Sequence, residues 1–168
     1  MEMVLTIQPQ LCTGCRSCEM ACSLKHDQAC SPLLSRIRVL KWGEVSVNVP
    51  LMCQQCEEPP CEKACPNGAR VRDAKTGAMV TNENNCIGCR SCIHACPFGA
   101  PIVHPSGKSI TCDLCEGDPE CVQACTPNAL TWGTADSGTM LIKRQYSSAL
   151  VEGLKPPEVP MQSEQAAQ

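Results

Sequence analysis

The stretch CIGCRSCIHACPFGA, residues 86–100, carries four cysteines in the pattern C-x2-C-x2-C-x3-C. Residues 12–22 repeat that pattern, and the words TGCRSCEMAC (13–22) and IGCRSCIHAC (87–96) match at most positions. Each cysteine of the earlier copy lies 74 residues before its counterpart. Self-similarity at a fixed offset indicates an internal duplication. The chain is therefore built on a repeated cysteine-rich unit.

Two wider groups of four cysteines accompany these two copies. CQQCEEPPCEKACPNGA, residues 53–69, has the spacing C-x2-C-x4-C-x3-C, and CDLCEGDPECVQAC, residues 112–125, has C-x2-C-x5-C-x3-C. We number the groups one to four along the chain. Three crowded cysteines followed by a fourth are typical of bacterial ferredoxins, in which three thiolates hold one [4Fe–4S] cluster and the fourth ligates the other cluster of a pair. Four groups therefore predict four [4Fe–4S] clusters.

The connection between groups two and three indicates which groups belong together. After Cys65 come a short β-like stretch at 70–72, a glycine-containing turn at 75–77 and a second apolar stretch at 79–80. A strand, such a turn and a strand form a hairpin. This order resembles the middle of a two-cluster ferredoxin, so we expect groups two and three to form one module.

Groups one and four then form a second module that encloses the first. We expect the inner module to span residues 53–100 and the outer module to combine residues 1–52 with 101–142. The alternative is sequential pairing, of group one with two and of three with four. The 30-residue gap between Cys22 and Cys53 counts against it, because a ferredoxin hairpin needs a shorter connection.

The crossing rule of ferredoxins gives each cluster three cysteines of one group and the last cysteine of its partner group. In the nested arrangement the ligand sets are Cys12, Cys15, Cys18 and Cys125 for cluster 1; Cys22, Cys112, Cys115 and Cys121 for cluster 2; Cys53, Cys56, Cys61 and Cys96 for cluster 3; and Cys65, Cys86, Cys89 and Cys92 for cluster 4.

Short helices and hairpins are expected to carry these cysteines, which predicts an α+β fold of two nested modules, each like a bacterial 2[4Fe–4S] ferredoxin. The C-x3-C end of a group suits a helix, since residues four apart, such as Cys92 and Cys96, share one helical face. Alternating apolar residues around Gly43 predict a β-hairpin near residues 36–49. Residues 143–168 are polar and proline-bearing, which predicts a C-terminal arm.

Other uses of the cysteines are less consistent with the sequence. The cysteine count is odd, and the N-terminus lacks the basic stretch and apolar run of a signal peptide, so we expect a cytoplasmic protein and not a disulfide scaffold. Structural zinc is the main competitor, because C-x2-C is also half of a zinc site. Zinc sites separate two such pairs by a longer loop, whereas three cysteines here fall within seven residues, twice.

The composition excludes several further classes. Aromatic residues make up only 2% of the chain, too few for an ordinary core, so bound clusters are expected to fill the interior and to contribute folding free energy. The net charge of −3 and the lack of a basic stripe give no support to nucleic acid binding. The chain contains no apolar run of 18 residues, so we expect no membrane span.

The remaining candidate residues are interpreted mainly as residues without a direct functional role. Cys30 lies outside every group and is interpreted as an incidental free thiol. His26, His94 and His104 are interpreted as surface or packing residues, with His94, inside group three, as the candidate for tuning a cluster. We expect no catalytic residue, because a fully ligated cluster offers no open iron and no nucleotide-binding or nucleophile motif occurs.

On these motifs, over roughly residues 3–135, the chain resembles the four-cluster, ferredoxin-like subunits of the dimethyl sulfoxide reductase iron–sulfur subunit family. The resemblance implies the nested ligand sets. Two features depart from larger members: the fourth group is short, and Thr126-Pro127 follows Cys125 where Cys-Pro is usual. The chain also lacks their C-terminal membrane-docking extension. It is therefore most similar to the compact subunits of carbon monoxide dehydrogenases or tungsten-dependent aldehyde oxidoreductases, and RIRVLKWG…PLMCQQCEEPPC favours the latter.

The resemblance implies a non-catalytic electron-transfer subunit. It would take electrons from a large catalytic subunit, a tungsten or molybdenum pterin enzyme, and pass them to a second carrier or a flavin subunit. The alternatives are a free-standing polyferredoxin and a subunit of a carbon monoxide dehydrogenase or hydrogenase system. Self-association, which would join the clusters of several chains into a longer path, is a third hypothesis.

Overall fold

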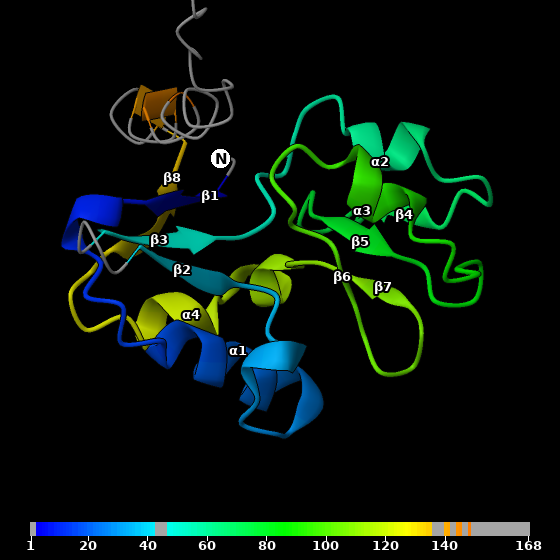
Figure 1. Ribbon diagram of the computed structural model, residues 1–168. Coiled ribbons are helices and arrows are strands. Elements are labelled where there is room, and N and C mark those ends of the chain that lie inside the picture. Colours follow the sequence, from blue (N-terminus) through cyan, green and yellow to red (C-terminus); the bar gives the residue numbers. More distant parts are fainter. Residues whose placement is uncertain (1–2, 43–46, 136–139, 142–143, 146–147, 149–168) are drawn as a thin grey trace, which may run out of the picture.

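The computed structural model describes residues 3–42, 47–135, 140–141, 144–145 and 148 (Figure 1). The described part is an α+β protein with four separate two-stranded sheets and short helices, in agreement with the expected fold class. The C-terminal arm predicted for residues 143–168 lies outside the described residues, apart from 144, 145 and 148. None of the described helices is both long and apolar enough to span a bilayer.

The elements are short strands, most of them consecutive pairs, and helices of one to three turns. The strands are β1 (Met3–Ile7), β2 (Arg38–Trp42), β3 (Val47–Leu51), β4 (Arg70–Arg72), β5 (Met79–Thr81), β6 (Ile102–Val103), β7 (Ser109–Ile110) and β8 (Leu130–Thr134). The α-helices are α1 (Ser17–Asp27), α2 (Pro60–Lys63), α3 (Ser91–Ala95) and α4 (Glu120–Gln123), and the 3-10 helices are η1 (Pro9–Leu11), η2 (Pro32–Leu34) and η4 (Leu114–Gly117).

The first and last described strands pair with each other. β1 runs antiparallel to β8, with Leu5 opposite Trp132, because the apolar side chains of β1 and Leu130 of β8 are buried together. The hydroxyls of Thr6 and Thr131 lie 2.5 Å apart across this sheet. Beneath it, α1 packs against α4. The beginning of the chain and the segment around group four therefore share one half of the molecule (Figure 1).

The hairpin of β2 and β3 lies in the same half. Its open end pairs Arg38 with Leu51, so the hairpin extends two residues beyond the end of the predicted range. The connecting residues 43–46 lie outside the described residues. The backbone amide of Val39 donates to the buried Glu19 carboxylate at 2.6 Å. This bond fastens the hairpin to α1.

The other half of the molecule holds β4 to β7, α2 and α3 (Figure 1). β4 and β5 form a hairpin whose turn is fixed by Asp73, which accepts hydrogen bonds from the backbone amides of Lys75 and Thr76. These bonds lower the pKa of the Asp73 carboxyl. Helices α2 and α3 pack against each other above this hairpin.

One prediction about local structure is corrected. We expected Cys92 and Cys96 on one helical face, but α3 ends at Ala95 and Cys96 follows it in extended conformation. Pro97 directly after Cys96 explains this, since a residue before proline is disfavoured in helical conformation. In α1, by contrast, Cys18 and Cys22 lie on the same helix and both are buried.

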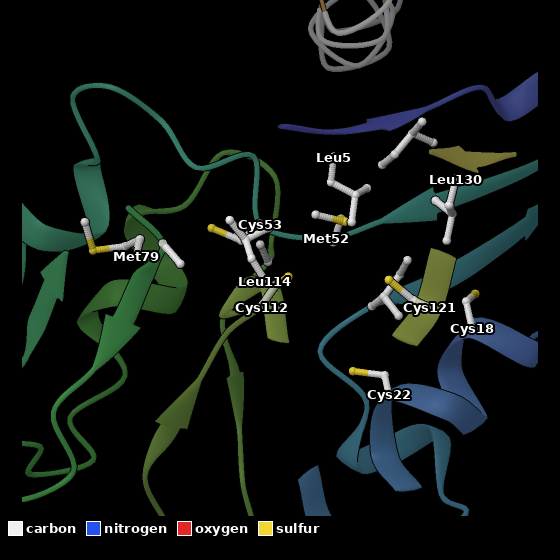
Figure 2. Close-up of a cluster of buried hydrophobic side chains, with 14 of the residues drawn as sticks. Leu5, Cys18, Cys22, Met52, Cys53, Met79, Cys112, Leu114, Cys121 and Leu130 are labelled. Carbon is white, nitrogen blue, oxygen red and sulfur yellow. The ribbon is translucent and has the colours of Figure 1, made fainter. Parts of the chain in front are cut away.

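Cysteines and small aliphatic side chains make up the described core (Figure 2). Phe98 and Trp132 are only partly buried. The core runs through both halves and includes seven buried cysteines: Cys18, Cys22, Cys53, Cys61, Cys92, Cys112 and Cys121.

Candidate iron–sulfur sites

Three of the four predicted ligand sets each line a single cavity. The cavities have empty volumes of about 410, 310 and 290 Å³, each partly open to solvent. Each joins three cysteines of one group to the last cysteine of another. The largest is lined by Cys65, Cys86, Cys89 and Cys92, the second by Cys22, Cys112, Cys115 and Cys121, and the third by Cys12, Cys15, Cys18 and Cys125.

The fourth predicted set is brought together less completely. Cys53 lies close enough to Cys56 and Cys61 for their charges to interact. Cys96 follows α3, which packs against α2, and α2 carries Cys61. The helix packing therefore brings the last cysteine of group three toward group two.

A left-handed residue stands before the second cysteine of every group. These residues are Gly14, Gln55, Gly88 and Leu114, with φ angles of 72°, 51°, 71° and 62°. Only glycine adopts this conformation without strain. Each loop thus turns sharply between its first two cysteines, and in group four the left-handed conformation continues through Cys115, Glu116 and Gly117.

Gly88 provides a test of this loop geometry. A Cβ at position 88 would lie 2.7 Å from the Gly107 carbonyl oxygen, in addition to the cost of a left-handed backbone, about 1–2 kcal/mol. We expect Gly88→Ala to lower the iron content by one cluster and to lower the melting temperature. Gly99→Ala is the matched control, because Gly99 has φ of 60° but nothing within 4 Å of the added Cβ. Equal effects of the two variants would contradict a requirement specific to the site.

The thiols of these sites differ in burial and in pKa. Burial raises the pKa of Cys18 to about 12 and that of Cys53 to about 11, and it raises the pKa of Cys112 well above its usual value. Hydrogen bonds from Ser17 and Ser91 lower the pKa of Cys15 and Cys89, which lie at the surface. The raised pKa values keep Cys18, Cys53 and Cys112 protonated at neutral pH, and a bound metal would displace these protons.

The chemistry of these donors fits iron–sulfur clusters. All 17 cysteines are present as thiols. Each cavity offers four sulfur ligands and largely apolar walls. Bound clusters would be held by these thiolates and would supply one-electron redox chemistry.

The sites lie close to one another in a definite order. Cys121 interacts electrostatically with Cys18, so the second cavity adjoins the third. Cys112 interacts with Cys53, and the Gln55 side-chain amide donates to the Cys112 carbonyl at 3.0 Å. Figure 2 shows Cys53 beside Cys112 and Cys121 beside Cys18.

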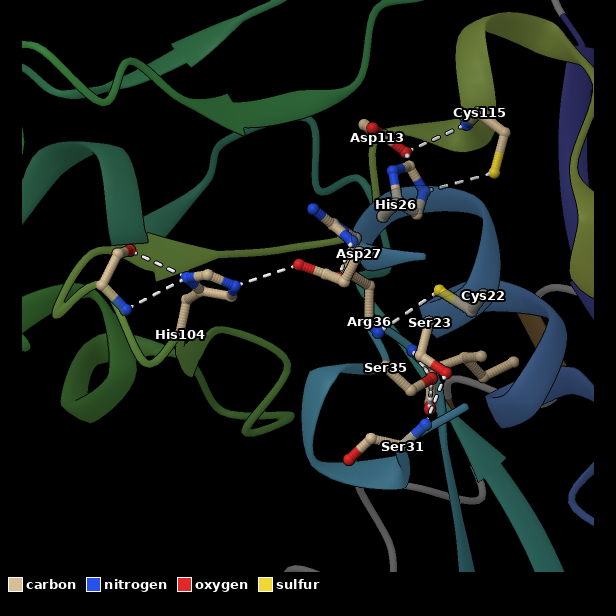
Figure 3. Close-up of polar contacts among 12 residues, drawn as sticks. Cys22, Ser23, His26, Asp27, Ser31, Ser35, Arg36, His104, Asp113 and Cys115 are labelled. Carbon is tan, nitrogen blue, oxygen red and sulfur yellow. Dashed lines mark hydrogen bonds and ion pairs between the residues drawn. The ribbon is translucent and has the colours of Figure 1, made fainter. Parts of the chain in front are cut away.

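One histidine, His26, lies beside a predicted cluster ligand. His94 is exposed, whereas His26 is half-buried with Nε2 3.6 Å from Cys115 Sγ and 3.4 Å from an Asp113 carboxylate oxygen (Figure 3). Burial lowers the pKa of His26. Because 89 residues separate His26 from Cys115, no local spacing could have revealed this contact.

The two other residues set aside in the sequence lie outside the cavities. His104 pairs with Asp27 at 2.9 Å, which links the two halves of the molecule. Cys30 is exposed after the end of α1, as expected for an incidental thiol.

The repeated cysteine groups, the four small sheets and the sulfur-lined cavities define a ferredoxin-type iron–sulfur protein. The chain matches the 4Fe-4S dicluster domain family over residues 45–135 and a 4Fe-4S binding domain over residues 9–25. It therefore belongs to the 4Fe-4S dicluster family.

The named relatives include a polyferredoxin-like subunit and an electron transport protein. The chain is 47% identical over 123 residues to the aliphatic sulfonate oxidoreductase, polyferredoxin-like subunit of Pyrococcus furiosus, covering 72% of this chain and 70% of that one. It is 39% identical over 145 residues to the electron transport protein HydN of Escherichia coli K12, covering 71% and 81%. Protein NrfC of the same organism is 33% identical over 168 residues, covering 87% and 74%.

A solved structure matches nearly the whole chain. It is the active site complex BamBC of benzoyl coenzyme A reductase, with a TM-score of 0.45 and 23% identity, covering 92% of this chain and 98% of that chain.

Proposed function

We propose that this protein is a non-catalytic electron-transfer subunit with four [4Fe–4S] clusters in two nested modules. The three cavities carry the proposal, because each joins cysteines that the nested ligand sets assign to one cluster. The inner module comprises residues 53–100, and the outer module residues 1–52 and 101–142. One half of the molecule holds α2, α3, β4 and β5 of the proposed inner module, and β6 and β7, from the residues assigned to the outer module, lie in the same half (Figure 1).

The clusters form one path in the order 1, 2, 3, 4. The neighbouring thiols Cys18 and Cys121 support the step from cluster 1 to cluster 2, and Cys53 and Cys112 support the step from cluster 2 to cluster 3. Clusters 3 and 4 share the inner module. Electrons therefore pass from one half of the molecule to the other through its cysteine-rich core.

The two ends of this path reach the surface. Cys15 of cluster 1 and Cys89 of cluster 4 are exposed, whereas Cys53 and Cys112 are buried. Ile87, next to the cluster 4 loop, exposes 63% of its surface, which suits contact with another protein. Partners thus exchange electrons at these two positions.

The proposed donor is a large catalytic oxidoreductase subunit with a tungsten or molybdenum pterin cofactor, of the aldehyde oxidoreductase type, in the cytoplasm. The acceptor is a second carrier or a flavin subunit. The resemblance to compact members of the family supports this partner, and the Pyrococcus furiosus relative is itself named as a subunit of an oxidoreductase. A free-standing polyferredoxin is the second candidate, since HydN is named simply as an electron transport protein.

The cluster number has a direct test. Anaerobically purified protein is expected to contain about sixteen iron and sixteen sulfide ions per chain, four of each per cluster, without stoichiometric zinc. Redox titration followed by electron paramagnetic resonance should resolve four one-electron transitions. Half that iron content, or four zinc ions, would contradict the proposal.

The partner can be identified by anaerobic affinity capture of the natively expressed chain. We expect a stoichiometric complex that contains tungsten or molybdenum and reduces the clusters when its substrate is added. Recovery of the four-cluster chain alone would favour the free-standing carrier. Nickel in a co-purified subunit would instead favour a carbon monoxide dehydrogenase or hydrogenase system.

A further inference from the structure

Arg70 on β4 is a cation buried in the protein interior. It is 2% exposed, and its guanidinium donates to the hydroxyls of Thr81 at 2.6 Å and Thr111 at 3.0 Å and to the Met79 carbonyl at 3.3 Å. Its Nε is buried without a hydrogen-bond partner. Within the described part of the chain, no carboxylate lies within ion-pair distance of it. Arginine remains charged in proteins, so this charge needs compensation from another source.

Sulfur atoms are the available source of negative charge. Arg70 Nη2 lies 3.8 Å from Cys61 Sγ, which belongs to the cluster 3 set. Arg70 also lines the cavity of the cluster 4 set, together with Cys65 and Cys86. The guanidinium therefore stands between the two proposed clusters of the inner module.

The outer module has an uncharged residue at the equivalent position. Arg70 follows Cys65 by five residues and Leu130 follows Cys125 by five, and each begins a strand. Both are almost completely buried, Arg70 at 2% and Leu130 at 1% exposure. The repeat thus places a fixed positive charge beside one pair of clusters and an apolar side chain beside the other.

We infer that Arg70 is the shared counter-ion of clusters 3 and 4 and that its charge raises the reduction potential of both. This inference rests on the proposed function. Reduction of a cluster by one electron from the partner adds one negative charge, and a buried cation stabilises the more negative state. Burying a cation without a carboxylate is costly, and the thiolate-ligated clusters on either side offset that cost.

Arg70→Met tests the inference in the purified, cluster-loaded chain, because methionine keeps an unbranched apolar stem and removes the charge. We expect two of the four one-electron transitions to move to lower potential. The equilibrium constant for reduction should fall at least tenfold at each, which corresponds to 59 mV for one electron. The other two should stay in place. Arg70→Lys should keep all four near their original potentials. Lys63→Gln is the control, since Lys63 lies between Cys61 and Cys65 but its side chain is 68% exposed and screened by water.

Two results would overturn the role of Arg70. The first is an iron-replete Arg70→Met protein whose four transitions are unchanged. The second covers failed assembly: if Arg70→Met and Arg70→Lys both lose inner-module iron, then the hydrogen bonds of the guanidinium matter and its charge does not. Iron retained by Arg70→Lys and lost by Arg70→Met supports the counter-ion. A wild-type protein without four transitions would count against the four-cluster proposal itself, independently of these variants.

Discussion

Removing the iron from this protein is expected to unfold it. The described core contains seven buried cysteines, and Phe98 and Trp132 are only partly buried, so little apolar packing remains once the cavities lose their contents. Structural zinc sites contribute about 10–16 kcal/mol each, whereas a whole domain is typically stable by only about 5–15 kcal/mol. If one cluster contributes a comparable free energy, its loss removes most of the free energy of unfolding of the protein.

The experiment is anaerobic chelation with a reductant present, followed by proton nuclear magnetic resonance. Loss of chemical-shift dispersion together with the visible absorption is the expected result, and rebuilding the clusters with iron and sulfide should restore both. Reduced, metal-free protein that keeps its dispersed spectrum would show that the polypeptide packs without its clusters.

The second large effect concerns Cys22, where the two pairing schemes differ. Nested pairing places Cys22 with Cys115, so Cys22→Ser should cost the iron of cluster 2, and adding Cys115→Ser should cost little more. Adding Cys56→Ser instead should remove a second cluster, because those two residues would serve different clusters. Independent sites give additive losses and shared sites do not.

Sequential pairing makes the opposite prediction. In that scheme Cys22 and Cys56 serve one cluster, so their double variant would lose no more iron than a single one. Cys30→Ser is the matched control, because Cys30 is an exposed thiol just beyond α1 and should leave iron and spectra unchanged.

Features that depend on short spacing could be predicted from the sequence. The cysteine groups and the β4–β5 hairpin follow from neighbouring residues, and glycine marks two of the four left-handed loop positions. The other two are Gln55 and Leu114, for which no residue preference predicts a positive φ. At these two positions tertiary structure overrides local preference.

Features that depend on distant contacts were missed. The β-like stretch predicted at residues 70–72 does not indicate which of its side chains is buried, and in β4 Arg70 is buried whereas Val71 is exposed. The hydroxyls of Thr81 and Thr111 that receive its guanidinium come from other parts of the chain. His26 beside Cys115 is a second case. Single-sequence reasoning finds ligands by their spacing, but it cannot find the side chains that surround them.

The pairing of β1 with β8 has a consequence for biosynthesis. Thr6 and Thr131 are 125 residues apart, and a ribosome adding about 5–20 residues per second needs about 6–25 s to span that interval. During this time the nascent first strand has no partner, while the β4–β5 hairpin can already close on the emerging chain. The cysteines near the N-terminus are therefore synthesised long before the residues that pack around them. A cell that makes this protein has to deliver iron and sulfide late, or keep oxygen away from an unfinished chain.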